Sequence, residues 1–427
     1  MLTLNSEKQL TIPLFLKDLY GDDPKIISYQ NIRFEKLAKR FNELFGSQPV
    51  KYFSTPGRTE ISGNHTDHNH GMVIAASINL DSIACVAQAD SVVKIFSEGY
   101  EKPFIVQLDQ LNPIDVESGT TNALIRGIAS SFVEKGFNVG GFNACISSDV
   151  LQGSGLSSSA SIEVLIGTIF NHLYNDGKIQ PEEIAKIGQY AENVYFKKPC
   201  GLMDQMACAI GGIITIDFYD PEYPVINKID FEFLSTGYKL IVVDTEADHA
   251  NLTEEYASIP NEMKQVAKYF NKEYCSEISI EELLSEIKSL RKKVSDRAIL
   301  RAIHFLEENK RVEKQIDALN KNNFEEFLRL VNESGNSSYK YLQNIYSPHN
   351  VEEQEVSLAL ALSDIFIKEK GRGACRVHGG GFAGTILLFL PEELIEEYKT
   401  FITKAFKEDS VKVLSIRHYG AVCLTSL

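Results

Sequence analysis

Apolar residues recur along this chain with two spacings, one typical of strands and one typical of helices. Residues 29–45 follow the helical spacing and end before Gly46, so they predict an amphipathic helix. Further helices are predicted at 122–135, from 162 onward, at 181–195 and at 392–406, and residues 280–345 are helical in pattern almost throughout. Strands are predicted at 74–78, 82–87, 92–96, 142–150, 212–217, 237–244, 385–390 and 411–414.

A proline-bearing stretch at 219–224 separates two parts of this pattern. The first part mixes helices with strands that look antiparallel, and the second ends in the order strand, glycine loop, strand, helix, strand. A length of 427 residues favours two domains. We therefore expect an α+β protein with domains at 1–220 and 221–427 and a ligand cleft between them.

A turn of small residues, Gly153-Ser-Gly-Leu-Ser-Ser-Ser-Ala-Ser161, lies between the strand predicted at 142–150 and the helix that follows. Glycines let backbone amides approach an anion, and the N-terminus of a following helix adds N–H groups and the positive end of its dipole. Serine hydroxyls can contact phosphate oxygens or Mg2+. The turn indicates a phosphate site, although small residues between a strand and a helix also serve ordinary packing.

Two other segments combine glycine with residues that loops rarely need. Residues 55–71 place an arginine, carboxylates and three histidines in what we expect to be a turn-rich loop. Residues 376–384 contain three consecutive glycines that lead into the strand predicted at 385–390. Because each glycine costs folding entropy, three in a row indicate a backbone that passes close to another group.

Composition and charge narrow the possible partners. Hydrophobic residues at 44% and charged residues at 24% are typical of a soluble globular protein, and no apolar run is long enough to cross a bilayer. The net charge of −15 leaves no basic stripe for nucleic acid. We expect a monomer whose partners are small molecules, with no nucleic acid and no membrane. An anionic substrate such as ATP then needs a local basic or amide-rich site and Mg2+.

The cysteines and the first residues bear on location. The seven cysteines are scattered and form no CxxC pair, and residues 1–10 lack the basic and apolar segments of a secretion signal. We expect a cytoplasmic protein with reduced, mostly buried thiols.

Two carboxylates in the middle of the chain are candidates for chemistry. Asp204 either caps the short helix predicted at 205–210 or accepts a proton from a hydroxyl that attacks a phosphoryl group. In the second interpretation, Glu192 and a serine of the turn bind Mg2+. Arg58 then supplies fixed positive charge for the reacting groups.

A zinc site and the common nucleotide-binding motifs both fit this sequence poorly. The histidines of His65-Thr-Asp-His-Asn-His70 invite a metal interpretation, but no remote ligand set completes a zinc site, and such side chains also bind sugar hydroxyls. The phosphate turn lacks the lysine of a Walker loop, and Ser158 stands at the third glycine of a dinucleotide fingerprint. The turn therefore belongs to neither nucleotide motif.

Together, these segments resemble the motifs of the GHMP kinase superfamily, and within it those of the galactokinase family. Residues 56–68, PGRTEISGNHTDH, are similar to the signature PGRVNLIGEHTDY, and residues 153–160, GSGLSSSA, are similar to the ATP loop GGGLSSSA. Residues 378–384, HGGGFAG, are similar to TGGGFGG. Glu192 and the segment 198–205, KPCGLMDQ, match the part with a magnesium carboxylate and the catalytic aspartate. The resemblance covers nearly the whole chain, in the family's order.

The resemblance implies a fold, a reaction and a set of residues. The fold is the two-domain GHMP kinase fold, with an N-terminal domain like ribosomal protein S5 domain 2, a ferredoxin-like C-terminal domain and the active site between them. The reaction is ATP-dependent phosphorylation of a sugar, galactose first, at its anomeric hydroxyl. The implied catalytic residues are Asp204 and Arg58; the sugar contacts are Arg58, Asn64, His65, Asp67, Gly201, Asp204 and Tyr256; the ATP loop is Gly153, Ser154, Gly155, Leu156, Ser157, Ser158 and Ser159; and the Mg2+ ligands are Ser158 and Glu192.

Departures from the family pattern leave the sugar open. Asn64 stands where galactokinases have a glutamate that binds the distal hydroxyl of the sugar, and His68 stands where they have tyrosine. Glu60, Ser62, His378 and Ala383 also differ. An amide in place of a carboxylate eases repulsion of a charged C6 group, so galacturonate is an alternative substrate. A sugar-sensing protein on the same fold is an alternative of another class, and it would be free to lose one of the catalytic residues.

Overall fold

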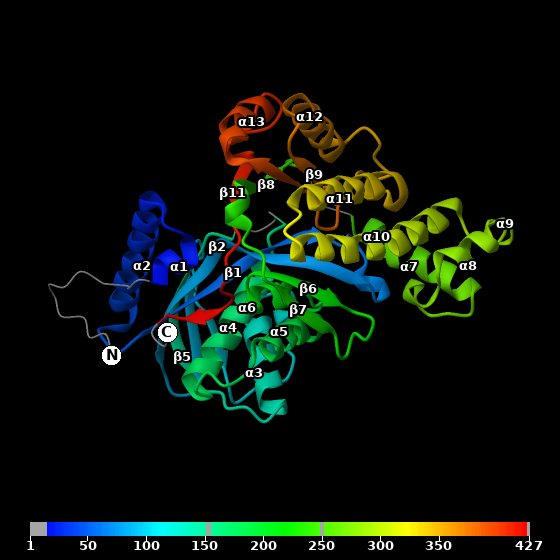
Figure 1. The fold of residues 1–427 in the computed structure, drawn as a ribbon. Helices are drawn as coiled ribbons and strands as arrows, with labels where there is room; N and C mark the ends of the chain where they lie inside the picture. The colour runs from blue at the N-terminus through cyan, green and yellow to red at the C-terminus, as the bar shows by residue number, and fades with distance from the viewer. Residues whose placement is uncertain (1–14, 151–154, 248–251, 425–427) are drawn as a thin grey trace.

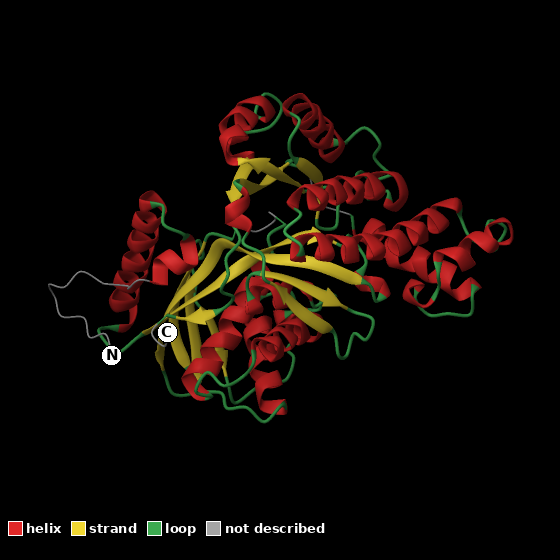
Figure 2. Cartoon of the chain, in the orientation of Figure 1, coloured by secondary structure: helices red, strands yellow, loops and turns green. Residues whose placement is uncertain are grey.

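The computed structural model describes residues 15–150, 155–247 and 252–424 and contains two antiparallel-rich sheets with helices packed against both (Figures 1 and 2). The helices are α1 (Phe15–Tyr20), α2 (Pro24–Phe45), α3 (Thr121–Glu134), α4 (Ser158–Tyr174), α5 (Pro181–Tyr190), α6 (Met203–Ile210), α7 (Thr253–Tyr269), α8 (Ile280–Ser285), α9 (Ile287–Leu290), α10 (Asp296–Asn320), α11 (Phe324–Ser337), α12 (Glu355–Lys370) and α13 (Ile395–Ile402). The strands are β1 (Lys51–Ser62), β2 (Met72–Gln88), β3 (Val92–Ser97), β4 (Phe104–Gln107), β5 (Phe142–Ser148), β6 (Ile213–Asp217), β7 (Val225–Ile229), β8 (Tyr238–Asp244), β9 (Ala374–His378), β10 (Thr385–Pro391), β11 (Val411–Leu414) and β12 (Val422–Cys423).

The larger sheet carries strands in the order β12-β1-β2-β5-β3-β4, and the hairpin of β6 and β7 adds to β2. Only the β3 and β5 pair is parallel among its described strands. Period-two alternation assigns the faces: Ala144 and Ile146 of β5 join the core under α3 to α6, whereas Cys145 between them packs under α1 and α2. Both faces of the sheet are therefore covered by helices.

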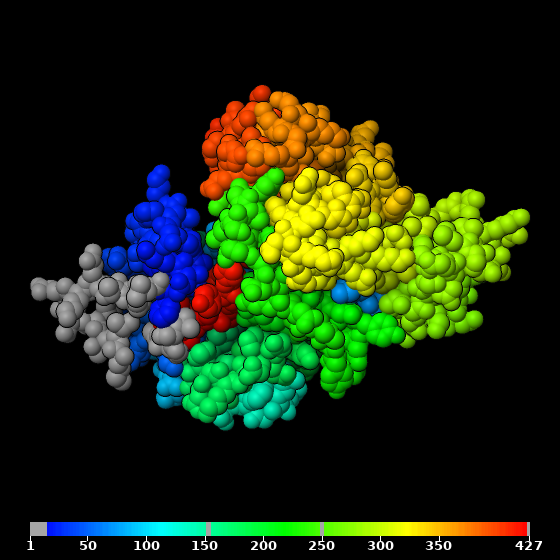
Figure 3. Space-filling model, viewed as in Figure 1, coloured from blue at the N-terminus to red at the C-terminus, as the bar shows by residue number. Residues whose placement is uncertain are grey.

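The smaller sheet has the order β11-β8-β10-β9, and all its pairs are antiparallel. Its outer face packs on α12 and α13. Its inner face shares a core with α10, α11 and the end of the larger sheet, so that Leu387 and Phe389 belong to the same cluster as Ile61 and Ile74. Helices α7 to α9 project to one side of this body (Figure 3).

The α+β fold confirms the predicted class, and most predicted elements are present. The expected turn-rich loop at 55–71 was wrong in its first half, because residues 55–62 continue strand β1. The turn-forming residues Pro56 and Gly57 instead coincide with a register shift between β1 and β2, and a second shift lies between Glu60 and Ser62. The strands predicted at 74–78 and 82–87 are one continuous strand, β2.

The predicted domain boundary after residue 220 falls inside the β6–β7 hairpin of the larger sheet. The C-terminal segment also returns to that sheet, where β12 pairs with β1. The division at 220 stays a prediction. Among the described residues, no helix is long and apolar enough to span a bilayer.

A buried ion cluster ties both ends of the described chain to β2. The Asp81 carboxylate, which has no exposed surface, accepts hydrogen bonds from Arg33 at 2.6 Å, Arg417 at 3.2 Å, the Tyr20 hydroxyl at 2.5 Å and Ser54. Two arginines on one carboxylate hold the N-terminal helices and the C-terminal segment against the strand that supports the site.

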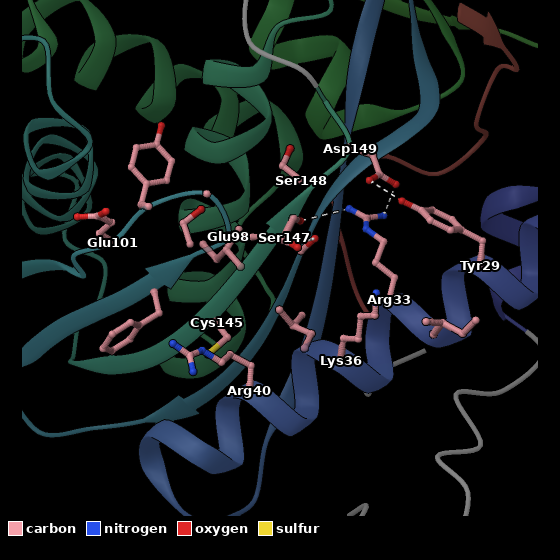
Figure 4. A pocket seen from close by; sticks show the side chains of 17 residues that line it. Tyr29, Arg33, Lys36, Arg40, Glu98, Glu101, Cys145, Ser147, Ser148 and Asp149 are labelled. Atoms are coloured by element: carbon pink, nitrogen blue, oxygen red, sulfur yellow. Dashed lines mark hydrogen bonds and ion pairs between the residues drawn. The ribbon is translucent and has the colours of Figure 1, made fainter. Parts of the chain in front are cut away.

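Arg33 also borders a cavity of about 660 Å³ between α2, the end of β3 and β5 (Figure 4). The cavity has Lys36 and Arg40 on the α2 wall and Glu98 and Glu101 on the opposite wall. Arg33 also pairs with Asp149 at 3.0 Å, just after the end of β5. This ion pair joins α2 to the chain at the end of β5.

Candidate active site

Three segments that are far apart in the sequence meet at the second half of β1 and the start of α4. The backbone N–H of Arg58 donates to the carbonyl of Leu156 at 3.1 Å, which joins the first segment to the phosphate turn. Gly155 faces the third segment so closely that a Cβ atom would lie 3.0 Å from Thr385 Oγ1 and 3.3 Å from His378 Nδ1. The structure thus brings together the glycine-bearing segments that the sequence analysis singled out.

The centre of the site is an ion pair between Arg58 and Asp204. Arg58 Nε and Nη2 each donate to one carboxylate oxygen at 2.7 Å, and Nη1 donates to the carbonyl of Gly155 at 2.5 Å. Ser157 donates to the same carboxylate. Asp204 lies in the first turn of α6, where its side chain forms no cap, so the capping interpretation of this residue was wrong.

This pairing fixes the charge state of both groups. Burial alone raises the pKa of a carboxyl, but the Arg58 guanidinium and the Ser157 hydroxyl outweigh burial and lower the pKa of Asp204 below its ordinary value. Burial likewise disfavours the guanidinium cation, and the contact with Asp204 raises the pKa of Arg58 in spite of it. Asp204 is therefore an anion at neutral pH, available to accept a proton.

Glu192 lies beside this pair in a π-helical turn, Ala191–Phe196, that continues α5. Its carboxylate is almost fully buried and accepts from the Ser159 hydroxyl at 3.2 Å and from Lys198 Nζ at 3.2 Å. A π-helical turn shifts side chains by one position relative to an α-helix and is frequent at functional sites. Ser158, the predicted metal-binding serine, is the first residue of α4, one position before the serine that contacts Glu192.

A second buried carboxylate, Glu163, was missed by the sequence analysis. The side-chain amide of Gln205 donates to Glu163 at 2.9 Å and to Glu192 at 3.0 Å, so one NH2 group links the two carboxylates. Burial and the charge of Glu192 raise the pKa of Glu163 well above its ordinary value. Its position in the second turn of α4, two residues after Ser161, was the available sequence signal.

The described part of the phosphate turn has the features that bind anions. Ser157 adopts a left-handed conformation with φ of 59°, and α4 begins at the next residue. The first N–H groups of this helix have no partner within the helix and point toward the turn. The structure describes five of the predicted ATP-loop residues, Gly155, Leu156, Ser157, Ser158 and Ser159. The predicted contacts Gly153 and Ser154 lie outside the described residues.

His65 links the first segment to the third glycine segment. Its Nε2 lies 2.8 Å from the carbonyl oxygen of Gly380, and its Nδ1 is buried without a hydrogen-bond partner. Burial, first of all, and the neighbouring His68 lower the pKa of His65 to about 3, so the ring is neutral. Because a carbonyl only accepts, Nε2 carries the proton, and Nδ1 has a lone pair that no protein group engages.

The other predicted sugar contacts are Asp67, Gly201 and Tyr256. A Cβ atom on Gly201 would lie 2.7 Å from a carboxylate oxygen of Asp67, so these two predicted sugar contacts are neighbours. The Tyr256 hydroxyl donates to the carbonyl of Gly381 at 3.0 Å, and its ring lies against Gly380. A Cβ on Gly381 would overlap the carbonyl oxygen of Asn344. The close approach predicted from the three glycines is confirmed at Gly380 and Gly381, whereas a Cβ atom on Gly379 would meet nothing within 4 Å.

Asn64 has no exposed surface, and protein groups engage its amide completely. Its NH2 group donates to Glu60 Oε1 at 3.0 Å and to the carbonyl of Gly379 at 2.6 Å. Its carbonyl oxygen accepts from Asn344 at 2.7 Å and from Ser338 at 3.3 Å. The predicted contact of Asn64 with the sugar stays a prediction. Asn64 has no unused amide hydrogen to donate to the C6 carboxylate of galacturonate, the alternative substrate.

Among the described residues, no group of three or more His, Cys, Asp or Glu side chains is arranged to hold a metal ion. The zinc interpretation of the histidine string therefore has no support in the structure. A single carboxylate with serine hydroxyls is instead the kind of protein contribution that Mg2+ accepts when substrate phosphates complete its shell.

Comparison with known proteins agrees with this geometry. Residues 123–212 match the family model "GHMP kinases N terminal domain", and residues 39–88 match "Galactokinase galactose-binding signature". The structure of Lactococcus lactis galactokinase, solved with galactose, aligns with 91% of this chain and 99% of that chain with a TM-score of 0.78 and 24% identity. A Methanococcus jannaschii mevalonate kinase aligns with 87% of this chain and 99% of its own, with a TM-score of 0.60 and 19% identity.

The fold and the site define the chain as a GHMP kinase, which implies use of ATP. The chain is 30% identical over 385 residues to the galactokinase of Clostridium acetobutylicum, covering 87% of this chain and 93% of that protein. The corresponding enzyme of Clostridium tetani is 29% identical over 388 residues, covering 88% and 93%. The chain belongs to the galactokinase family and is a kinase that phosphorylates an alcohol group.

Proposed function

We propose that this galactokinase family member transfers the γ-phosphoryl group of ATP to the anomeric hydroxyl of galactose, with Asp204 as the proton acceptor. The observation that carries the proposal is the Arg58–Asp204 pair, held against the phosphate turn by Gly155 and Ser157. The hydroxyl oxygen bonds to the γ-phosphorus, the bond to the bridging oxygen of ADP breaks, and the hydroxyl proton passes to Asp204.

In this reaction the protein contributes mainly position and charge. Because its pKa is low, Asp204 is a weak base, so it accepts the proton as the phosphorus–oxygen bond forms rather than before. Arg58 remains a cation throughout and stabilises negative charge on the acceptor oxygen and on the group in transfer. The N-terminal amides of α4 and the serine hydroxyls hold the phosphates of ATP.

The residues around Glu192 fit Mg2+. A buried carboxylate lies beside serine hydroxyls, and Glu163 and Gln205 each leave an oxygen atom buried without a partner nearby. When bound, Mg2+ neutralises phosphate charge and aligns the nucleotide. Glu192 and Ser158 are its proposed ligands, and Lys198 supplies a further positive charge to Glu192.

The sugar contacts we propose are Arg58, Asp204, His65, Asp67, Gly201 and Tyr256. His65 is the best supported of the distal contacts, since its buried Nδ1 has no protein partner and can accept a sugar hydroxyl. A screen of ADP release with galactose, galacturonate, N-acetylgalactosamine, glucose and arabinose tests the proposal. We expect the highest kcat/KM with galactose, and a higher value for any other sugar would refute the assigned substrate.

Replacing Arg58 by glutamine is expected to lower kcat by about 10²- to 10³-fold, because it removes the cation closest to the reacting oxygen. It is also expected to move the acid limb of the kcat/KM profile to higher pH. Arg58 lowers the pKa of Asp204 while burial raises it, so loss of the arginine leaves burial dominant. Steady-state rates between pH 4 and 9 measure both effects; an acid limb that does not move would contradict the pairing.

Replacing Glu192 by glutamine is expected to raise the Mg2+ concentration for half-maximal activity by about tenfold or more, because a neutral amide is a poor ligand for a hard cation. A Mg2+ titration at saturating ATP and galactose measures it. Glu183, which is on the outer side of α5 and pairs with Lys135, provides the matched Glu→Gln control. Equal Mg2+ requirements for the two variants would exclude Glu192 as a ligand.

A further inference from the structure

Four of the positions where this chain departs from the galactokinase motifs, Glu60, Ser62, Asn64 and His378, lie together in one buried polar cluster, whereas His68 and Ala383 lie outside it. We define the Asn64 cluster by its members, and none of them is more than about one tenth exposed. Its members are Thr59, Glu60, Ser62, Asn64, Glu308, Ser338, Asn344, Arg376 and His378.

The hydrogen bonds of the cluster join the departures to one another. Thr59 and His378 are 3.1 Å apart across the first and third segments. Ser62 donates to Glu308 at 3.3 Å. Burial, with the charges of neighbouring arginines, lowers the pKa of His378 to about 3, so this residue is a neutral hydrogen-bonding group. The departures therefore support one another structurally.

Within the cluster, a carboxylate and an amide have exchanged places relative to the signature. The signature reads Asn at the position of Glu60 and Glu at the position of Asn64, and this chain has the reverse. The two side chains are in contact, since Asn64 donates to Glu60 Oε1. Arg376 donates to the same oxygen at 2.9 Å, so the carboxylate at position 60 has a buried cationic partner of its own.

The Asn64 amide has no hydrogen-bonding capacity left for a ligand. An asparagine side chain has two N–H donors and one oxygen with two lone pairs. Here Glu60 and Gly379 take both donors, and Asn344 and Ser338 occupy the oxygen. A sugar hydroxyl at this position would have to displace one of these buried partners.

We propose that Asn64 is a structural cross-link between β1 and the third glycine segment. Its amide then makes no hydrogen bond to the C6 hydroxyl of the sugar, and the kinase does not recognise that hydroxyl. The acceptor class is then galactose-configured sugars with a neutral C6 position, whether or not it bears a hydroxyl. This inference rests on the proposed function. Selectivity among sugars at this site would then depend on the groups around the anomeric hydroxyl and on His65.

Comparing galactose with 6-deoxygalactose tests the inference in the wild-type enzyme. A site with a buried polar group dedicated to a hydroxyl rejects an analogue that lacks it by about 10⁴-fold, whereas a site without one discriminates by about 10- to 100-fold at most. We expect a ratio of kcat/KM values below about 100, and a larger ratio overturns the inference. Absence of transfer to both sugars would instead refute the proposed function itself.

The variant Asn64→Ala gives a second, independent measurement. Loss of the cross-link is expected to reduce kcat/KM for both sugars by the same factor, within about threefold, because neither sugar touches the amide. If Asn64 binds the C6 hydroxyl, the variant loses activity with galactose alone and the ratio falls. Ser338→Ala removes only the 3.3 Å partner and is the matched control. The wild-type ratio decides the question even if the Asn64 variant does not fold.

Discussion

Replacing Asp204 by asparagine is expected to lower kcat by about 10²- to 10⁴-fold while the KM values for ATP and galactose change little. The amide cannot accept the hydroxyl proton, but its oxygen can still receive a hydrogen bond from Arg58. Binding geometry is therefore largely retained and proton transfer is lost. Steady-state kinetics with both substrates varied separates the two effects.

The matched control for this variant is Asp176→Asn, since Asp176 is highly exposed and forms an exposed ion pair with Lys178 at 3.0 Å. Its kinetics are expected to equal those of the wild type. A turnover of Asp204→Asn within tenfold of the wild type would show that another group accepts the proton.

Replacing Asp81 by asparagine is expected to lower the free energy of unfolding by about 3–5 kcal/mol, because Arg33 and Arg417 then lose their shared buried counter-charge. Denaturant unfolding followed by circular dichroism measures this change. Asp296→Asn breaks an exposed pair with Arg291 and is expected to leave the stability near the wild-type value. Equal losses in the two variants would contradict a special role for the buried cluster.

The stabilising effect of Asp81 has a defined pH dependence. Burial raises the pKa of this carboxyl, but Arg33 and Arg417 outweigh burial and bring the pKa below its ordinary value. A depressed pKa stabilises the folded state fully above the unfolded-state value, about 3.9, and this stabilisation is lost as the pH falls toward the folded-state value. The difference between wild type and Asp81→Asn is therefore expected to shrink below about pH 4.

The spacing of apolar residues predicted most helices and strands correctly. It failed where a strand contains turn-forming residues. Pro56 and Gly57 resemble a turn in sequence, yet β1 absorbs them as a register shift because its pairing with β2 continues on both sides. The polar residues Asn79 and Asp81 divided β2 into two predicted strands. In the structure both are satisfied by long-range partners, Asn79 by Ser415 and Asp81 by the two arginines.

The meeting of the proposed catalytic residues could be predicted because these residues lie in short motifs. Arg58, Ser157 and Asp204 meet where the motifs predict. The distal end could not be predicted in the same way. Whether the Asn64 amide is available depends on Ser338 and Asn344, which lie about 280 residues away in helices and turns without a motif. Position 64 alone therefore indicated a sugar contact, and only the fold reveals its protein partners.

Phosphorus and carbon nuclear magnetic resonance of the product formed from galactose and ATP tests most directly the claim that Asp204 faces the anomeric hydroxyl. The account predicts a single sugar phosphate whose phosphorus couples to C1, formed by the wild type and at least about 100-fold more slowly by Asp204→Asn. A phosphate on another carbon, or the same product at the same rate from both proteins, would contradict it.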